Sequence, residues 1–320
     1  MLNISKTCPN KMPRYYPKRR SYSYAKRRTP TKRAKVSPRR RSYGKKKYGG
    51  KLTKKRVLNM TSVKKRDTML SWTNSTGSSQ TGGTTYSTNA AVINGGLSDI
   101  QVACFVWCAT ARDNTVSSTG NQGTTFNTAT RTSSSPYMVG LKESIEIQCN
   151  TGMPWQWRRI CFTYKGPILT NSTSFAMAIE TSNGWMRVVN QLAGNPGSDP
   201  QYSFFVKLFK GQNLADWVDP MIAKTDNSRV TVKYDKTITL ASGNEDGFIR
   251  KYNRYHPMNK TLVYDDDEVG GGVNAATYST EGKAGMGDYY VVDIIRARQG
   301  SSTTDQLTFR PEATLYWHEK

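Results

Sequence analysis

The stretch RVTVKYDKTITL, residues 229–240, decides the fold class of this chain, because apolar and polar side chains alternate along it. A period of two residues is that of a β-strand with one face buried and the other in water. One face carries Val230, Val232, Tyr234, Ile238 and Leu240, and the other carries Thr231, Lys233, Asp235, Thr237 and Thr239. The pattern predicts a half-buried strand of an antiparallel sheet.

Other stretches extend the β pattern in both directions. LKESIEIQC (141–149) also alternates, with Ile145, Ile147 and Cys149 on its inner face. Three runs are apolar on both faces, which predicts central strands covered on both sides: QVACFVWC (101–108), YSFFVKLF (202–209) and DYYVVDII (288–295). Further strands are expected at RRICFTYK (158–165), SFAMAIE (174–180), WMRVVN (185–190), TLVY (261–264) and ATLYWH (313–318).

Helical periodicity is scarce. NLADWVD (213–219) predicts one short helix, since Leu214, Trp217 and Val218 share a face and Pro220 follows. Many strands without alternating helices predict an all-β fold, a single jelly roll formed as an eight-stranded double-sheet sandwich with extra loops. An immunoglobulin-like sandwich fits the periodicity equally well, but 254 residues in one unrepeated domain is long for it.

Charge divides the chain into two parts. Of 47 Lys and Arg residues, 25 precede the first acidic residue, Asp67, and the other 22 face all 23 acidic residues. We therefore expect a basic arm over residues 1–66 and a nearly neutral shell domain over residues 67–320. The arm repels itself and has few aliphatic side chains to bury, which predicts that it is disordered in isolation.

The arm requires a polyanionic partner. A membrane-binding basic segment needs an apolar helical face, whereas this arm has five prolines and its aromatic residues are tyrosines. Nucleic acid is the favoured partner, and the tyrosines favour a single strand, because their rings can stack on bases. The stacking candidates are Tyr15, Tyr16, Tyr22, Tyr24, Tyr43 and Tyr48.

The arm's cations are assigned to DNA binding from charge alone. They are Arg14, Lys18, Arg19, Arg20, Lys26, Arg27, Arg28, Lys32, Arg33, Lys35, Arg39, Arg40, Arg41, Lys45, Lys46, Lys47, Lys54, Lys55, Arg56, Lys64, Lys65 and Arg66. The same short clusters are typical of nuclear-localisation signals, so the host nuclear-import machinery is a second expected partner.

The termini and cysteines suggest no export and no membrane insertion. The N-terminus lacks the apolar region of a secretory signal, and no apolar run is long enough for a membrane span. The five cysteines are an odd number, and we expect free thiols. They are Cys8, Cys104, Cys108, Cys149 and Cys161.

A search for catalytic motifs finds none, so we expect no enzyme and no cofactor. The two histidines, His256 and His318, are far apart, and neither a zinc-deaminase motif nor a P-loop is present. His256 is interpreted as a packing or hydrogen-bonding residue. The glycine-rich EGKAGMGDYY (281–290) precedes a strand rather than a helix, which favours an ordinary loop. Cys104 and Cys108 share a strand face and are interpreted as buried packing.

The acidic run YDDDEVGGG (264–272) is the one candidate for a cation site, through Asp265, Asp266, Asp267 and Glu268. It lacks the alternating ligands of an EF-hand loop. A solvated loop, or one paired with Arg or Lys of a neighbouring subunit, is the favoured interpretation, and we expect no metal.

Five strings in order make the chain recognisable: KKRDTMLSW (64–72), PWQWRRICFTYKG (154–166), FIRKYNRYHPMNKTLVYDDDE (248–268), GKAGMGDYYVVDI (282–294) and ATLYWHEK (313–320). Together they resemble capsid proteins of the genomoviruses, the gemycircularvirus group, whose coat proteins are similar in architecture to those of geminiviruses. The resemblance runs from about Lys64 to the C-terminus.

The resemblance implies a jelly-roll subunit that assembles into a small icosahedral shell and packages circular single-stranded DNA. About 60 copies are expected per shell, with the protein in the virion and, during assembly, in the host nucleus. The alternative is an accessory protein without a shell, such as a single-stranded nucleic-acid binder or a movement factor.

Overall fold

The computed structural model describes residues 53–320 except 81, 98–100, 117–119, 170–174 and 193–199. The chain clusters into two units, 1–51 and 52–320, and only the second is described here. None of the described helices is both long and apolar enough to span a membrane.

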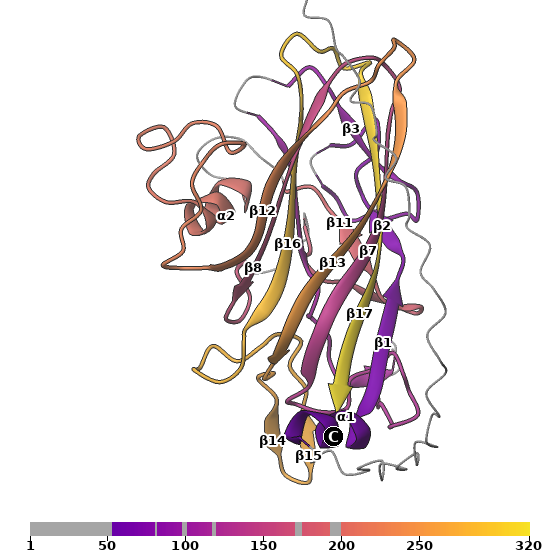
Figure 1. Ribbon diagram of the computed structural model, residues 1–320, viewed down its shortest axis with the longest axis vertical. Coiled ribbons are helices and arrows are strands. Elements are labelled where there is room, and N and C mark those ends of the chain that lie inside the picture. Colours follow the sequence, from indigo (N-terminus) through magenta and orange to yellow (C-terminus); the bar gives the residue numbers. More distant parts are fainter. Residues whose placement is uncertain (1–52, 81, 98–100, 117–119, 170–174, 193–199) are drawn as a thin grey trace, which may run out of the picture. The chain divides into compact units, whose positions relative to one another are not determined.

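The described unit is built on two antiparallel sheets (Figure 1). The first has the strand order β1 (Val63–Met69), β17 (Gln306–Glu319), β7 (Tyr137–Cys149), β13 (Phe248–Thr261), with β3 (Ala91–Asn94) also pairing with β17. The second has the order β12 (Thr231–Leu240), β8 (Trp155–Tyr164), β16 (Asp288–Ala297), β4 (Ala103–Cys108). An all-β sandwich is therefore confirmed.

Shorter elements complete the unit. β2 and β11 pair in parallel, whereas the other short pairs are antiparallel. They are β2 (Ser71–Thr73), β11 (Arg187–Val189), β5 (Thr115–Val116), β6 (Asn121–Gln122), β9 (Glu180–Thr181), β10 (Gly184–Trp185), β14 (Asp267–Val269) and β15 (Gly272–Asn274). The helices are α1 (Lys54–Thr61) and α2 (Pro200–Leu208).

In the first sheet, buried and exposed side chains alternate along the strands, which shows which face of the sheet is exposed to solvent. In β17 every second side chain is buried, and in β7 Ile145, Ile147 and Cys149 are buried as expected. The buried side chains pack between the two sheets, where Trp107, Trp157 and Trp317 are almost fully enclosed. The opposite face of the first sheet is the exposed one.

Within the second sheet, β4 and β16 are covered on both faces, and their side chains are buried along almost the whole of each strand. The outer face of this sheet packs against α2, where Phe204 and Phe205 join a buried cluster with Phe162 and Tyr290. The strand expected at 202–209 is therefore wrong: residues 202–208 lie in α2, and this helix covers the outer face of the sheet. A short apolar run has the same pattern in a buried strand and in a buried helix, and Pro200 at the first helical position is the local signal for the helix.

Three smaller expectations are also wrong. Residues 213–219 form a turn rather than a helix, with Leu214 at φ 67° and Trp217 packed on Phe209. The run 174–180 is not a strand beyond Glu180 in β9, and its first residue lies outside the described ones. The run 261–264 contributes only Thr261, the last residue of β13.

Two long strands, β1 and β13, were not expected, and neither were the shorter strands β2, β3, β5, β6, β14 and β15. Both long strands carry many charged residues, and β13 has polar side chains even on its inner side, so neither shows a clean apolar alternation.

Because β1 starts at Val63 and α1 at Lys54, the folded unit begins before Asp67. The boundary placed between residues 66 and 67 is therefore corrected towards the N-terminus. The structure confirms the strands expected around 101–108, 141–149, 158–165, 229–240, 288–295 and 313–318. The strand expected at 185–190 is confirmed only in part, by β11 and the end of β10.

Candidate nucleic-acid interface

Most of the expected DNA contacts, from Arg14 to Lys47, and all six arm tyrosines lie outside the described residues. The described part of the basic segment begins at α1, which contains Lys54, Lys55 and Arg56. Thr53 caps this helix by accepting a hydrogen bond from the Arg56 amide at 3.3 Å. The Arg56 side chain is exposed, so its charge is available to a polyanion.

The next three cations, Lys64, Lys65 and Arg66, are consecutive in β1 and differ in their exposure. Because successive side chains of a strand point to opposite faces, Lys64 and Arg66 are exposed whereas Lys65 is only 2 % exposed. The Lys65 ammonium lies 3.1 Å from Glu319 and donates to the Thr130 carbonyl at 2.8 Å and the Thr132 hydroxyl at 3.1 Å. The assignment of Lys65 to DNA binding is therefore wrong, since its charge is used inside the protein.

Glu319 is well suited to hold that buried cation. Burial would raise the pKa of this carboxyl, but hydrogen bonds from Thr132 and from the Trp317 indole outweigh it, so the pKa lies below its usual range. The carboxylate is thus charged at neutral pH. The pair fastens the start of β1 to the end of β17.

The acidic run is engaged within the chain. Asp266 receives two hydrogen bonds from Arg131, at 2.5 and 2.9 Å, and the guanidinium lies over the Tyr264 ring at 3.8 Å. The expected pairing of this run with a neighbouring subunit is wrong for Asp266. Asp267 and Glu268 lie exposed in β14. Nowhere among the described residues do three or more His, Cys, Asp or Glu side chains gather as metal ligands would.

His256 is buried against ionisable neighbours. Its Nε2 lies 3.7 Å from Glu143 and 3.9 Å from the Cys161 thiol, and burial lowers its pKa. Burial also raises the pKa of the Cys104 and Cys108 thiols well above the usual value. His256 is buried, and Cys104 and Cys108 are buried in the cluster between the second sheet and α2, as their interpretation as packing residues requires. The four cysteines within the described ranges form no disulfide.

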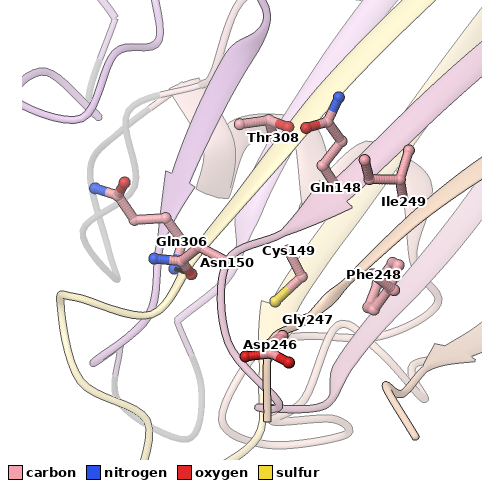
Figure 2. A pocket seen from close by; sticks show the side chains of 9 residues that line it. All are labelled: Gln148, Cys149, Asn150, Asp246, Gly247, Phe248, Ile249, Gln306 and Thr308. Carbon is pink, nitrogen blue, oxygen red and sulfur yellow. Dashed lines mark hydrogen bonds between the residues drawn. The ribbon is translucent and has the colours of Figure 1, made fainter. Parts of the chain in front are cut away.

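A pocket of about 380 Å³ opens at the Cys149 end of the first sheet (Figure 2). Its lining residues are Gln148, Cys149, Asn150, Asp246, Gly247, Phe248, Ile249, Gln306 and Thr308. Asp246 is the one carboxylate in this lining, and the Cys149 sulfur accepts a hydrogen bond from the Trp155 indole at 3.2 Å. The lining thus contains neither a carboxylate pair nor a histidine beside a nucleophile, the arrangements that hydrolysis uses.

Residues that the sequence analysis did not single out lie on the same sheet face as Lys64 and Arg66. Lys142 in β7 and Tyr255 in β13 are exposed there, and Tyr316 of β17 is partly exposed. Alternation in 141–149 already placed Lys142 opposite to the buried isoleucines. No local signal could have paired it with β1, because the two strands are joined only through β17.

No protein-family model matches the chain, and the curated proteins contain no match to it.

Proposed function

We propose that the chain is the capsid protein of a small single-stranded DNA virus, which assembles into an icosahedral shell and packages the genome through its basic arm. The observation that carries the proposal is the charge division: 25 Lys and Arg residues without an acidic residue precede Asp67, on a body that is otherwise close to neutral. Such an arm neutralises phosphates with little dependence on base sequence. The proposed role is structural and involves no reaction.

The strand order supports a jelly roll as the architecture of the shell domain. The long strands in chain order are β1, β4, β7, β8, β12, β13, β16 and β17. If these eight strands are numbered 1 to 8 along the chain, the strands that lie side by side in the first sheet are 1, 8, 3 and 6. Those of the second sheet are 2, 7, 4 and 5. This order agrees with the double Greek-key connection expected of a jelly roll, a fold common in viral capsids and also found in lectins, and it therefore supports the proposal.

The amount of charge fits the cargo. A closed shell of roughly 60 copies would bring on the order of 1500 arm charges to a genome with one negative charge per nucleotide. That suits a genome on the order of 2000 nucleotides, with small cations covering the rest. The arm's basic clusters would also serve nuclear import before assembly, which accounts for an expected location in the host nucleus and then in the virion.

Electron microscopy of the purified full-length protein at moderate salt tests the proposal, together with recovery of nuclease-protected nucleic acid. Closed isometric particles that hold protected single-stranded DNA are the expected result. Monomers or irregular protein–DNA aggregates under all conditions would overturn the shell and favour an accessory single-strand binder.

A further inference from the structure

One half of the exposed face of the first sheet combines cations with aromatic rings. We call this half the basic tyrosine face and define it as Lys64, Arg66, Tyr137, Lys142, Tyr255 and Tyr316. The three cations are exposed, Tyr137 and Tyr255 are 40 % and 54 % exposed, and Tyr316 is partly exposed. Their neighbours along each strand, such as Leu141 and Leu315, are buried, so these side chains share the outward side.

Strand register places the cations and rings in adjoining rows. Arg66 lies opposite Tyr316. Lys64 lies opposite His318, whose ring centroid is 6.3 Å from that of Tyr137 on the next strand. Lys142 lies opposite Tyr255. With strands about 4.8 Å apart and outward residues about 7 Å apart along each strand, the face measures roughly 14 Å in each direction.

The hydroxyl end of the Tyr255 side chain lies over Gly140. A β-carbon added at Gly140 would come within 2.6 Å of the Tyr255 hydroxyl and 2.8 Å of Cζ, so the ring occupies the space that the glycine leaves free. Since Tyr255 is also half exposed, its outer side is open to solvent. An open ring face is what base stacking requires.

The charge of this half differs from that of the rest of the sheet. The rows that hold the basic tyrosine face contain no acidic side chain on the outward side. Farther along the same face, Glu312 and Glu146 alternate with Arg310 and Lys251, which makes that half mixed. The half that holds the basic tyrosine face is thus the one suited to a polyanion.

We infer that the basic tyrosine face binds single-stranded nucleic acid, with phosphates on Lys64, Arg66 and Lys142 and bases stacked on Tyr137, Tyr255 and Tyr316. A duplex hides the faces of its bases, so the rings select an unpaired strand. A four-stranded sheet with exposed aromatic residues stacks two or three bases in other single-strand binders, and this sheet presents three tyrosines that are at least partly exposed. The inference deepens the proposed function, on which it rests for its partner, by adding a folded site to the arm.

Ultraviolet cross-linking of the full-length protein to an oligothymidylate tests this site, with the linked tyrosines mapped by peptide mass spectrometry. Links at Tyr255 and at Tyr137 or Tyr316, beside any in the arm, are expected. Links confined to residues 1–52 would overturn the inference and leave the packaging arm intact. An absence of links anywhere would overturn both the inference and the proposed function.

A charge-matched pair of variants provides a second readout in the full-length chain. The triple variant K64A/R66A/K142A removes the three cations of the face, and the control K236A/K251A/R310A removes three exposed cations elsewhere. A plot of the logarithm of the binding constant against the logarithm of the salt concentration has a slope whose size grows by about 0.7 for each phosphate contact to a single strand. The size of this slope should therefore fall by about 2 in the first variant only. Equal slopes in the two variants would overturn the inference.

Discussion

Arg159 and Asp293 face each other on the neighbouring strands β8 and β16 and are joined by two parallel hydrogen bonds, Nε to Oδ1 at 2.7 Å and Nη2 to Oδ2 at 2.9 Å. Arg187 of β11 donates to Asp293 at 3.1 Å and to Glu143 of β7 at 3.1 Å, and Arg159 also donates to Glu143. All four side chains are at most 2 % exposed. Two carboxylates and two guanidiniums thus form a neutral cluster that joins the two sheets.

Replacing one carboxylate of this cluster should destabilise the fold strongly. Asp293→Asn keeps the side-chain shape but leaves two buried guanidiniums facing one carboxylate, so the free energy of unfolding should fall by about 3 to 5 kcal/mol. Denaturant unfolding followed by tryptophan fluorescence measures the change. The matched control is Asp235→Asn, whose ion pair with Arg158 is partly exposed at Asp235 (29 %) and should cost about 1 kcal/mol or less. Equal losses in the two variants would contradict the importance of the cluster.

Adjacent lysines of β1 should respond in opposite ways. Lys65→Ala leaves the Glu319 carboxylate buried without its ammonium partner, so stability should fall by about 3 kcal/mol or more. Lys64→Ala removes an exposed charge, so stability should change by less than about 0.5 kcal/mol while affinity for single-stranded DNA falls. Thermal unfolding and DNA titration of both variants check this. Similar losses of stability in the Lys64→Ala and Lys65→Ala variants would contradict the burial of Lys65 and the exposure of Lys64.

Stability should depend on the protonation of Asp288. Burial raises the pKa of this carboxyl to about 6, although Thr110 and the Ser279 amide donate hydrogen bonds to it. Between about pH 4 and pH 6 the folded protein holds a proton that the unfolded chain has released, so this group's contribution to stability is lost as the pH rises. Relative to Asp288→Asn, the natural protein should lose up to about 3 kcal/mol from pH 4 to pH 7. Denaturant unfolding at several pH values gives this difference, and a constant difference would contradict it.

Removing the arm should separate packaging from folding. A chain that lacks residues 1–52 loses 19 of the 25 cations before Asp67 but keeps α1, β1 and both sheets. We expect the far-ultraviolet circular dichroism of a β protein to persist, whereas nuclease-protected DNA is lost and the salt slope of DNA binding falls steeply. Unchanged DNA retention by the truncated protein would contradict the packaging role of the arm.

Local patterns identified most of the sheets. The alternation in β7 and β12, and the runs apolar on both faces in β4 and β16, are consequences of neighbours within a few residues of each other, so they can be read along the chain. The run at 202–209 was misassigned because periodicity does not distinguish a short buried strand from a buried helix. β13 was missed because Arg250 and Arg254 occupy its inner side at the edge of the sandwich.

The sequence by itself determined the β class of the body and the concentration of positive charge ahead of Asp67, because both depend on residue type and order alone. Only the tertiary structure decided that Lys65 is held by Glu319 while Lys64 faces water, and that Lys142 lies opposite Tyr255 on the sheet face that also carries Tyr316. The physical reason is that strand pairing joins residues far apart in the chain, and their burial and partners follow from that pairing.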